Sequence, residues 1–475
     1  MLDGAERDRL DGLAAKLLAS EPALAATGAF GARVATGLGG GPALLFEDHG
    51  EIPLVGRRGD SALQYRPLLL AGDGDLVVLP VRRSPAFEAY CRDTLGLGRP
   101  DVLDLPPAPS GRRFTIARSC VEAPQVLGRI LGTARRHRAL DVVPYIGTGS
   151  VWRLAGLIAT QVDADVRVAA PPPRLTRRVN DKLWFAARVV DVLGHEALPP
   201  SYHAFGPAAL AGRVAALARR CERVVIKVPD SAGSAGNLAL DSAAVRTLPL
   251  AKLRMRLLGL LRHLGWRQTF PLMVGVWECP ALASPSVQIW VPRRADGPPV
   301  VEGVFDQVVE GPGGEFVGAA PCGLSEPWRA RLASEAQRLA WLFQTLGYFG
   351  RCSFDAIVTG TDEATAALHW IECNGRWGGT SIPMTVANRL VGDWTRAYLR
   401  VVQRIGVRTA RMDVAAALER LGPRLWRRDG PGTGIVLLTP GGLEEGTGAH
   451  FLVLAPGAAE AERDIAAVDA LLGTG

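Results

Sequence analysis

The side chains with the clearest capacity for chemistry lie in residues 369–379 (HWIECNGRWGG) and, slightly earlier, at Asp355. Asp355 and Glu372 supply carboxylates and Asn374 supplies an amide carbonyl, which are the hard oxygen ligands that Mg²⁺ prefers. Arg376 adds a guanidinium that can pair with phosphate oxygens. Together these side chains predict a site for a metal-bound phosphate, such as that of ATP.

A hairpin must bring these side chains together. The sequence predicts one strand at residues 351–358 and another at 366–374, joined by a polar turn at 359–364. Because side chains alternate faces along a strand, Glu372 and Asn374 share a face. Asp355 joins them only if the numbers of paired residues add to an odd total. An exposed hairpin with ordinary polar residues is the alternative, and the Gly378-Gly379 pair that follows favours the metal site.

Lysine is rare in this chain, so its positions are informative. There are four lysines and four asparagines against fifty arginines. Lys227 ends a β-branched run, where a lysine is costly to bury unless a counter-charge such as phosphate lies beside it. The next loop, 231–237, offers backbone N–H groups and small residues that can cover phosphate oxygens, namely Ser231, Gly233, Ser234 and Gly236. A plain hairpin turn is the alternative, and the preceding lysine favours phosphate binding.

Composition restricts the class of protein. A length of 475 residues predicts roughly three domains, and no window of about 18 residues is apolar enough for a membrane span. The start of the chain lacks a secretory signal, so we expect a cytoplasmic protein. Seven cysteines without a C-x-x-C pair predict free thiols and no structural zinc site.

The charge indicates the kind of partner. A net charge of +7 favours anionic partners, but the arginines are dispersed and lack interleaved aromatic residues. We therefore expect no nucleic acid and no membrane as a partner. A homodimer is left open by the sequence.

The order of predicted elements suggests four segments. Apolar runs alternate with helical stretches up to about residue 170, which predicts an α/β domain with a parallel sheet. A Pro171–Pro173 break follows, then a helix with Asn180 as its N-cap. Further strands are predicted at 272–277, 286–292 and 300–309, and a helix at 327–346. The predicted boundaries are 1–173, 174–280, 281–400 and a small α+β tail, 401–475.

The residues described above resemble the ATP-grasp superfamily over about 180–385. The resemblance rests on Asn180-Asp181-Lys182, on Lys227 with its loop, on Asp355, and on Glu372 to Arg376 with the following glycines. A narrower resemblance, to ATP-grasp peptide ligases of the pheganomycin type, draws on residues 144–149, 178–182 and 303–307. That type carries an additional N-terminal domain, the pre-ATP-grasp domain.

This resemblance implies a Rossmann-like pre-ATP-grasp domain, a two-lobed ATP-grasp fold and a small C-terminal extension. It implies that Lys182 and Lys227 hold the α- and β-phosphates of ATP, and that the 231–237 loop covers the β/γ end. The metal ligands for two Mg²⁺ ions would be Asp355, Glu372 and Asn374, with Arg376 and Lys227 as catalytic residues. Glu278 would contact the adenine or ribose, although the usual acidic residue a few positions later is absent and Gln288 stands near that place.

The implied activity is an ADP-forming carboxylate–amine ligase. ATP would convert a carboxylic or amino acid into an acyl phosphate, and an amine or peptide acceptor would attack it to give an amide, with peptide natural products as the setting. The substrate carboxylate has three candidate partners, Arg293, Arg294 and Arg351. A carboxylase or carbamoyl-phosphate type enzyme and a non-catalytic nucleotide-binding protein are the alternatives. The motifs of P-loop enzymes, serine hydrolases and zinc proteases are absent from the sequence.

Overall fold

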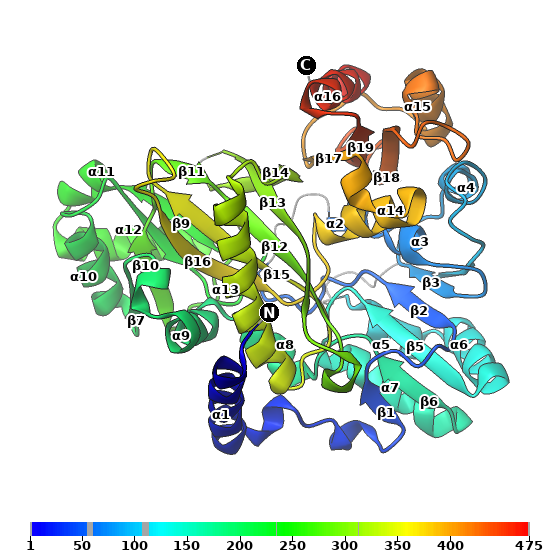
Figure 1. The fold of residues 1–475 in the computed structure, drawn as a ribbon, viewed down its shortest axis with the longest axis horizontal. Coiled ribbons are helices and arrows are strands. Elements are labelled where there is room, and N and C mark those ends of the chain that lie inside the picture. Colours follow the sequence, from blue (N-terminus) through cyan, green and yellow to red (C-terminus); the bar gives the residue numbers. More distant parts are fainter. Residues whose placement is uncertain (1, 55–59, 107–113, 234, 312, 474–475) are drawn as a thin grey trace.

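The computed structural model describes residues 2–54, 60–106, 114–233, 235–311 and 313–473. In this part of the chain the strands form a six-stranded, a four-stranded and a nine-stranded sheet. Figure 1 shows the four-stranded sheet with its helices at one end of the molecule, the six-stranded sheet at the other, and the nine-stranded sheet connecting them. The mixed α/β architecture predicted from the sequence is confirmed.

The N-terminal sheet is parallel, as predicted, with the strand order β1-β6-β5-β2-β3-β4. Leu44 and Phe46 of β2 pack against the helices α5 to α7, whereas Leu45 packs on the opposite face. Burial on both faces explains the continuous apolar runs of these strands. The strands are β1 (Val34–Thr36), β2 (Ala43–Phe46), β3 (Leu76–Leu79), β4 (Asp101–Asp104), β5 (Ala139–Pro144) and β6 (Asp165–Val168). The helices are α2 (Asp60–Leu63), α3 (Pro67–Leu70), α4 (Pro85–Ala89), α5 (Ile116–Glu122), α6 (Pro124–His137) and α7 (Gly149–Val162).

Two helices lead from this sheet to the next, α8 (Pro173–Val179) and α9 (Lys182–Leu193). The predicted cap of α9 is wrong by one residue. Asp181 is the N-cap, and its carboxylate accepts hydrogen bonds from the backbone N–H groups of Leu183 and Trp184. Asn180 is instead the C-cap of α8, and its side-chain oxygen accepts a hydrogen bond from the Gly375 N–H. Both residue types suit an N-cap, so the local pattern alone does not separate them.

Residues 201–276, which we call the small lobe, form the four-stranded antiparallel sheet with its helices. The predicted glycine-tipped hairpin is confirmed, since Lys227 pairs with Asn237 across β8 and β9. The strands are β7 (Ser201–Ala204), β8 (Arg223–Lys227), β9 (Asn237–Asp241) and β10 (Leu272–Val276). The helices are α10 (Pro207–Leu217), α11 (Ser242–Arg246) and α12 (Leu250–His263).

The large sheet is antiparallel, with the order β11-β15-β12-β13-β14-β17-β19-β18, and β16 pairs with β15. One face packs on α13 (Glu326–Thr345), which in turn contacts α1 (Gly4–Ser20). Phe343 of α13 lies 5.5 Å from Phe354 between ring centroids. The strands are β11 (Ala281–Ala283), β12 (Pro285–Val291), β13 (Val300–Glu310), β14 (Glu315–Pro321), β15 (Gly350–Thr359), β16 (Ala367–Asn374), β17 (Tyr398–Ile405), β18 (Gly434–Thr439) and β19 (Gly448–Ala455).

The C-terminal segment extends the large sheet. β17 begins at Tyr398 and pairs with β14, and β19 and β18 continue outward from it. Its helices are α15 (Val414–Leu421) and α16 (Ala458–Leu472), and α14 (Ser381–Val391) precedes β17. Leu437 and Phe451 share a hydrophobic core with Leu45 of the N-terminal sheet. The C-terminal segment therefore packs against the N-terminal sheet as well as extending the large sheet. Its predicted boundary at residue 401 stays a prediction.

Only two residue pairs join β14 to β17, so this junction is sensitive to spacing. A Cβ at Gly318 would lie 2.2 Å from the carbonyl oxygen of Val401. We predict that Gly318→Ala separates the strands and costs about 1–3 kcal/mol, as overpacking does. Thermal unfolding measures this, with Gly259→Ala as the control, because its Cβ would meet nothing within 4 Å. Equal melting temperatures for the two variants would contradict the prediction.

Candidate active site

The carboxylates meet because of the register between β15 and β16. Asp355 pairs with Glu372 and Ser353 pairs with Asn374, so the paired numbers add to an odd total. Asp355, Glu372 and Asn374 therefore share a face, as the sequence required for a cluster. A β-bulge between Asp355 and Ala356 shifts the register for the rest of the hairpin. The odd-sum register that the cluster needs is thus confined to the half of the hairpin that carries Asp355, Glu372 and Asn374.

Asp355 is held by three polar neighbours in a buried position, where it is 6% exposed. Ser286 Oγ donates a hydrogen bond to its Oδ1 at 2.6 Å, and Asn374 Nδ2 donates to its Oδ2 at 2.8 Å. Gln307 also stabilises the charged form. Burial, followed by the charge of Glu372, nevertheless raises the pKa of Asp355 to about 7. The carboxylate needs additional positive charge nearby to be fully ionised at neutral pH.

Lys182, in the first turn of α9, supplies positive charge to the second carboxylate. Its Nζ lies 2.9 Å from Glu372 Oε2 and donates to the carbonyl oxygen of Ser231 at 3.2 Å. Burial by itself would raise the pKa of Glu372, but the charges of Lys182 and Lys227 outweigh it and lower this pKa to about 2. Glu372 is therefore ionised.

Lys227, at the end of β8, faces the same cluster from the small lobe. Burial, with the charge of Lys182, lowers its pKa, while the carboxylates of Glu372, Glu278 and Asp355 act in the opposite direction. These interactions place the Lys227 ammonium within electrostatic reach of both predicted metal-binding carboxylates. The structure thus brings together the two lysines and the two carboxylates that the sequence singled out.

The loop after Lys227 closes over Lys182. Ser231 Oγ lies 3.3 Å from Lys182 Nζ and donates to the carbonyl oxygen of Val228. Gly233 has φ +61°, a conformation that suits glycine. A Cβ at Gly236 would lie 2.2 Å from Ser231 Oγ, so only glycine fits there. Ser234, the remaining predicted residue of this loop, lies outside the described residues.

Asn180 connects α8 with the glycine-rich segment after β16. Its Oδ1 accepts from the Gly375 N–H at 3.1 Å and from the Arg376 guanidinium. Arg376 also donates to Asn374 Oδ1 at 2.6 Å. The guanidinium therefore lies beside the predicted metal ligands, held between two asparagine side chains.

Glu278, just after β10, contacts a histidine of β16. One of its carboxylate oxygens is 2.6 Å from His369 Nδ1, and the other is buried without a hydrogen-bond partner among the described residues. The carboxylate also acts on the pKa of Lys227. Its predicted contact with adenine or ribose stays a prediction.

The three candidate arginines for a substrate carboxylate lie in different settings. Arg293 and Arg294 are in exposed ion pairs with Asp296 and Asp11, beyond the end of β12 that is remote from Ser286. Arg351 is partly buried and paired with Glu302, with the rings of Trp290 and Trp377 at 5.5 and 4.9 Å. The structure does not bring Arg293 and Arg294 to the cluster.

The donor set is compatible with Mg²⁺. Among the described residues no group of three or more His, Cys, Asp or Glu side chains could hold a metal. Two carboxylates and one amide oxygen nevertheless suit an ion that keeps several waters and bridges phosphate oxygens. Asp355, Glu372 and Asn374 would hold such an ion, while its other ligands would come from water and substrate.

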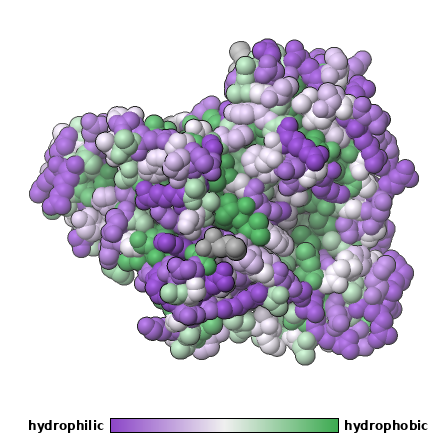
Figure 2. All heavy atoms as spheres, in the orientation of Figure 1, coloured by the Kyte–Doolittle hydropathy of each residue, from purple (hydrophilic) through white to green (hydrophobic). Residues whose placement is uncertain are grey.

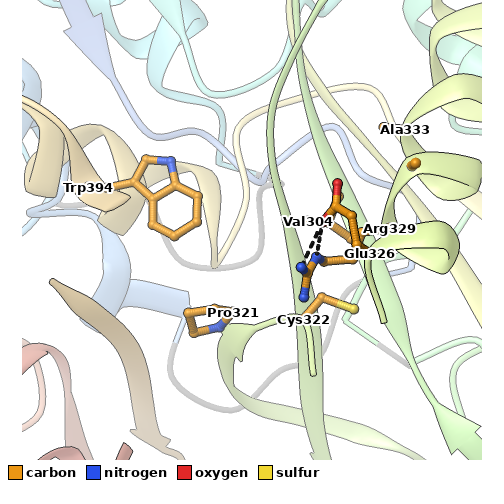
Figure 3. Close-up of a pocket in the computed structure, with 8 residues that line it drawn as sticks. Val304, Pro321, Cys322, Glu326, Arg329, Ala333 and Trp394 are labelled. Atoms are coloured by element: carbon orange, nitrogen blue, oxygen red, sulfur yellow. Dashed lines mark hydrogen bonds and ion pairs between the residues drawn. The ribbon is translucent and has the colours of Figure 1, made fainter. Parts of the chain in front are cut away.

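A cavity of about 350 Å³ elsewhere in the molecule does not belong to this site (Figure 3). It is lined by Val304, which pairs with Val287 on the α13 side of the sheet, and by Trp394 and Arg329. The Arg329 guanidinium already donates to Glu326 and to the carbonyl oxygen of Leu324. The cluster of lysines and carboxylates is therefore the better candidate.

Comparison with known proteins identifies the fold. Residues 64–160 match the family model "Pre ATP-grasp domain". A biotin carboxylase from Campylobacter jejuni, in complex with β,γ-ATP, has a TM-score of 0.57 at 13% identity, with 90% of this chain and 91% of that chain covered. The chain has the fold of the ATP-grasp enzymes. No curated protein matches it in sequence.

Two further structures with the ATP-grasp fold contain nucleotides. The biotin carboxylase domain of Hydrogenobacter thermophilus 2-oxoglutarate carboxylase, with MgADP and bicarbonate, has a TM-score of 0.53 at 13% identity, over 87% of this chain and 86% of that chain. N5-carboxyaminoimidazole synthase from Aspergillus clavatus, with ADP and 5-aminoimidazole ribonucleotide, has a TM-score of 0.52 at 13% identity, over 91% and 98%. At this identity the likeness establishes the fold alone.

Sequence reasoning did not identify two contributors to the site, Ser286 and His369. Ser286 and Gln288 are polar residues two apart in an otherwise apolar strand, and Gln288 donates to Ser286 Oγ at 2.9 Å. This alternation was a usable signal for a polar face on β12. For His369 no local pattern gives a signal, because its contact with Glu278 joins segments 91 positions apart.

The contacts of Asn180 lead to a prediction about stability. Asn180→Ala leaves the Gly375 N–H and one side of Arg376 unpaired, which we expect to cost on the order of 1 kcal/mol. Asn180→Asp keeps an acceptor oxygen for both groups and should lie between the alanine variant and the native chain. Thermal unfolding of the three proteins measures the effect. An aspartate variant less stable than the alanine variant would contradict the assigned contacts.

Proposed function

We propose that the chain is an ATP-dependent, ADP-forming ligase that activates a carboxylate as an acyl phosphate and joins it to an amine. The observation that supports this most is the convergence of Lys182 and Lys227 on the Asp355–Glu372 pair beneath a glycine-containing loop. Phosphoryl transfer requires mainly alignment and neutralisation of phosphate oxygens, and this arrangement offers both.

Each residue has a role in this proposal. Lys182 and Lys227 bind the α- and β-phosphates of ATP, and loop 231–237 covers the β/γ end and excludes water. Asp355, Glu372 and Asn374 hold Mg²⁺, with two ions proposed, and the metal neutralises charge on the bridging phosphate oxygens. Arg376 faces the transferred phosphoryl group. Glu278 contacts the adenine or ribose.

The carboxylate must be activated because a free carboxylate is a poor acylating agent. Transfer of the γ-phosphoryl group converts one carboxylate oxygen into a leaving group. The amine then attacks the carbonyl carbon, phosphate leaves, and an amide forms beside ADP. The pre-ATP-grasp match supports the peptide-ligase type with peptide natural products as its setting, because that type carries such a domain. A carboxylic or amino acid and an amine or peptide are the proposed substrates.

A carboxylase is the second candidate, because the structural neighbours favour it. One neighbour contains bicarbonate beside MgADP, and another contains an aminoimidazole ribonucleotide. Bicarbonate is itself a carboxylate that the same site can phosphorylate. The two candidates therefore share the nucleotide site and differ in which acid is activated.

Substitutions in the cluster test the nucleotide site. We predict that Glu372→Ala and Lys227→Ala each lower ATP turnover by about a hundredfold or more, because the first removes a proposed Mg²⁺ ligand and the second removes a cation that neutralises phosphate oxygens. Circular dichroism should show an intact fold. The exposed residues Glu122 and Lys16 provide matched alanine controls, which should keep native turnover. Native turnover in either cluster variant would refute its role.

A substrate screen separates the two candidates. ADP release is measured with panels of carboxylic acids and amines, and in parallel with bicarbonate and the same amines. We expect ADP release to depend on an organic acid together with an amine, with an amide detected by mass spectrometry. Turnover that requires bicarbonate and gives a carbamate would establish the carboxylase instead. Binding of Mg-ATP without turnover in every pairing would favour a non-catalytic protein.

A further inference from the structure

The positive charge of the chain is concentrated in the small lobe. Residues 201–276 contain eleven Lys and Arg against three Asp and Glu, a net charge of +8. The whole chain has a net charge of +7, so the other parts together are nearly neutral. No Asp or Glu occurs between Asp241 and Glu278, a stretch that contains α12. The charge is therefore local.

Most of these cations are exposed and have no ion-pair partner among the described residues. Nine of the eleven are exposed, and none of the nine forms an ion pair with another described residue. On α12, Lys252 and Arg256 are four residues apart, a spacing at which like charges destabilise a helix. Arg254 and Arg262 add to the same helix. Elsewhere in the chain exposed arginines commonly pair with carboxylates, as Arg331 does with Glu335.

The same lobe carries unusually exposed apolar side chains. Among the described residues, the three most exposed large hydrophobic side chains are Phe205, Met255 and Leu250, at 73%, 71% and 57%. Phe205 precedes α10, and the other two lie on α12, which packs against α10. These helices occupy one end of the molecule, and that end is largely hydrophilic on the face drawn in Figure 2. Apolar side chains amid unpaired cations are typical of a protein-binding surface.

We propose that the outer face of the small lobe, formed by α10 and α12, docks an acidic polypeptide. Carboxylates of the partner would pair with the arginines of α12, and its apolar side chains would cover Phe205 and Met255. Charge complementarity of this kind speeds association and makes it dependent on salt. Nucleic acid fits less well, because stacking on bases needs aromatic side chains and Phe205 is the only exposed Phe, Tyr or Trp that the described lobe presents. A membrane fits less well, because α12 buries its apolar face, Leu253, Leu257 and Leu261, in the core of the lobe and leaves only Leu250 and Met255 to enter a bilayer.

The proposal is independent of the proposed ligase activity. Of the lobe's cations, Lys227 faces the nucleotide site, whereas Lys252, Arg254 and Arg256 are exposed on α12. An experiment can therefore distinguish a loss of peptide docking at α12 from a loss of ATP turnover at the lysine–carboxylate cluster. A variant of α12 that loses partner binding should keep its basal affinity for Mg-ATP.

Fluorescence anisotropy of the full chain with labelled peptides tests the docking. The probe is an amphipathic peptide with Glu on one side and Leu and Phe on the other, and its control has Gln in place of every Glu. We expect binding of the Glu peptide alone at about 0.1 M salt, weakening as salt is raised. Arg254→Glu with Arg256→Glu should reduce its affinity by at least about tenfold, or ~1.4 kcal/mol. Phe205→Ser with Met255→Ser should also weaken it.

The control pair is Arg427→Glu with Arg428→Glu, which changes the net charge equally on exposed residues of the C-terminal segment. We expect this pair to bind the Glu peptide as the native chain does. Equal weakening by both pairs, or no binding of the Glu peptide, would overturn the proposal. Tighter binding of a single-stranded oligonucleotide or of phosphatidylserine vesicles, dependent on Arg254 and Arg256, would overturn it in favour of that other partner.

Discussion

The site depends on one electrostatic constraint, the placement of two carboxylates opposite each other on adjacent strands. Asp355 and Glu372 are paired in the sheet, and burial makes their mutual repulsion costly. The Lys182–Glu372 ion pair relieves part of it and requires the first turn of α9 to reach β16. Stacking of Phe185 of α9 on Phe354 of β15, at 5.8 Å, holds the helix there. The arrangement of charges thus fixes the helix that leads into the small lobe.

Backbone contacts connect the N-terminal domain to the site. Leu54, from the segment after β2, forms a bridge with Ser231, and its carbonyl oxygen accepts from the Ala232 N–H at 2.9 Å. On the other side of the cluster, the Trp377 N–H donates to the carbonyl oxygen of Tyr145 at 3.1 Å. Both contacts come from segments that follow parallel strands, the edge where α/β sheets present their binding loops. The N-terminal domain therefore supports the loop and the glycine-rich segment on either side of the lysine–carboxylate cluster.

The parts of this arrangement that follow from local rules could be predicted from the sequence. The period of two places Glu372 with Asn374, and the scarcity of lysine singles out Lys182 and Lys227. Asp355 joins the cluster through the register between β15 and β16, which the sequence leaves open. The contacts of Ser286 and the pairing of β17 with β14 join distant segments, so no local pattern specifies them. The N-cap of α9 was misplaced for a different reason, since Asn180 and Asp181 are both good caps. Only the tertiary contact of Asn180 with Gly375 decides between them.

The cations beside the carboxylate cluster and the exposed cations of α12 form two separate groups. Phosphate binding needs cations beside the carboxylate cluster, and Lys182, Lys227 and Arg376 already provide them. The arginines of α12 are exposed to solvent, where salt screens interactions between charges. Nucleotide binding therefore does not account for a lobe with a charge of +8. Like charges on one helix carry a cost in stability, and an acidic partner is the interaction that would offset it.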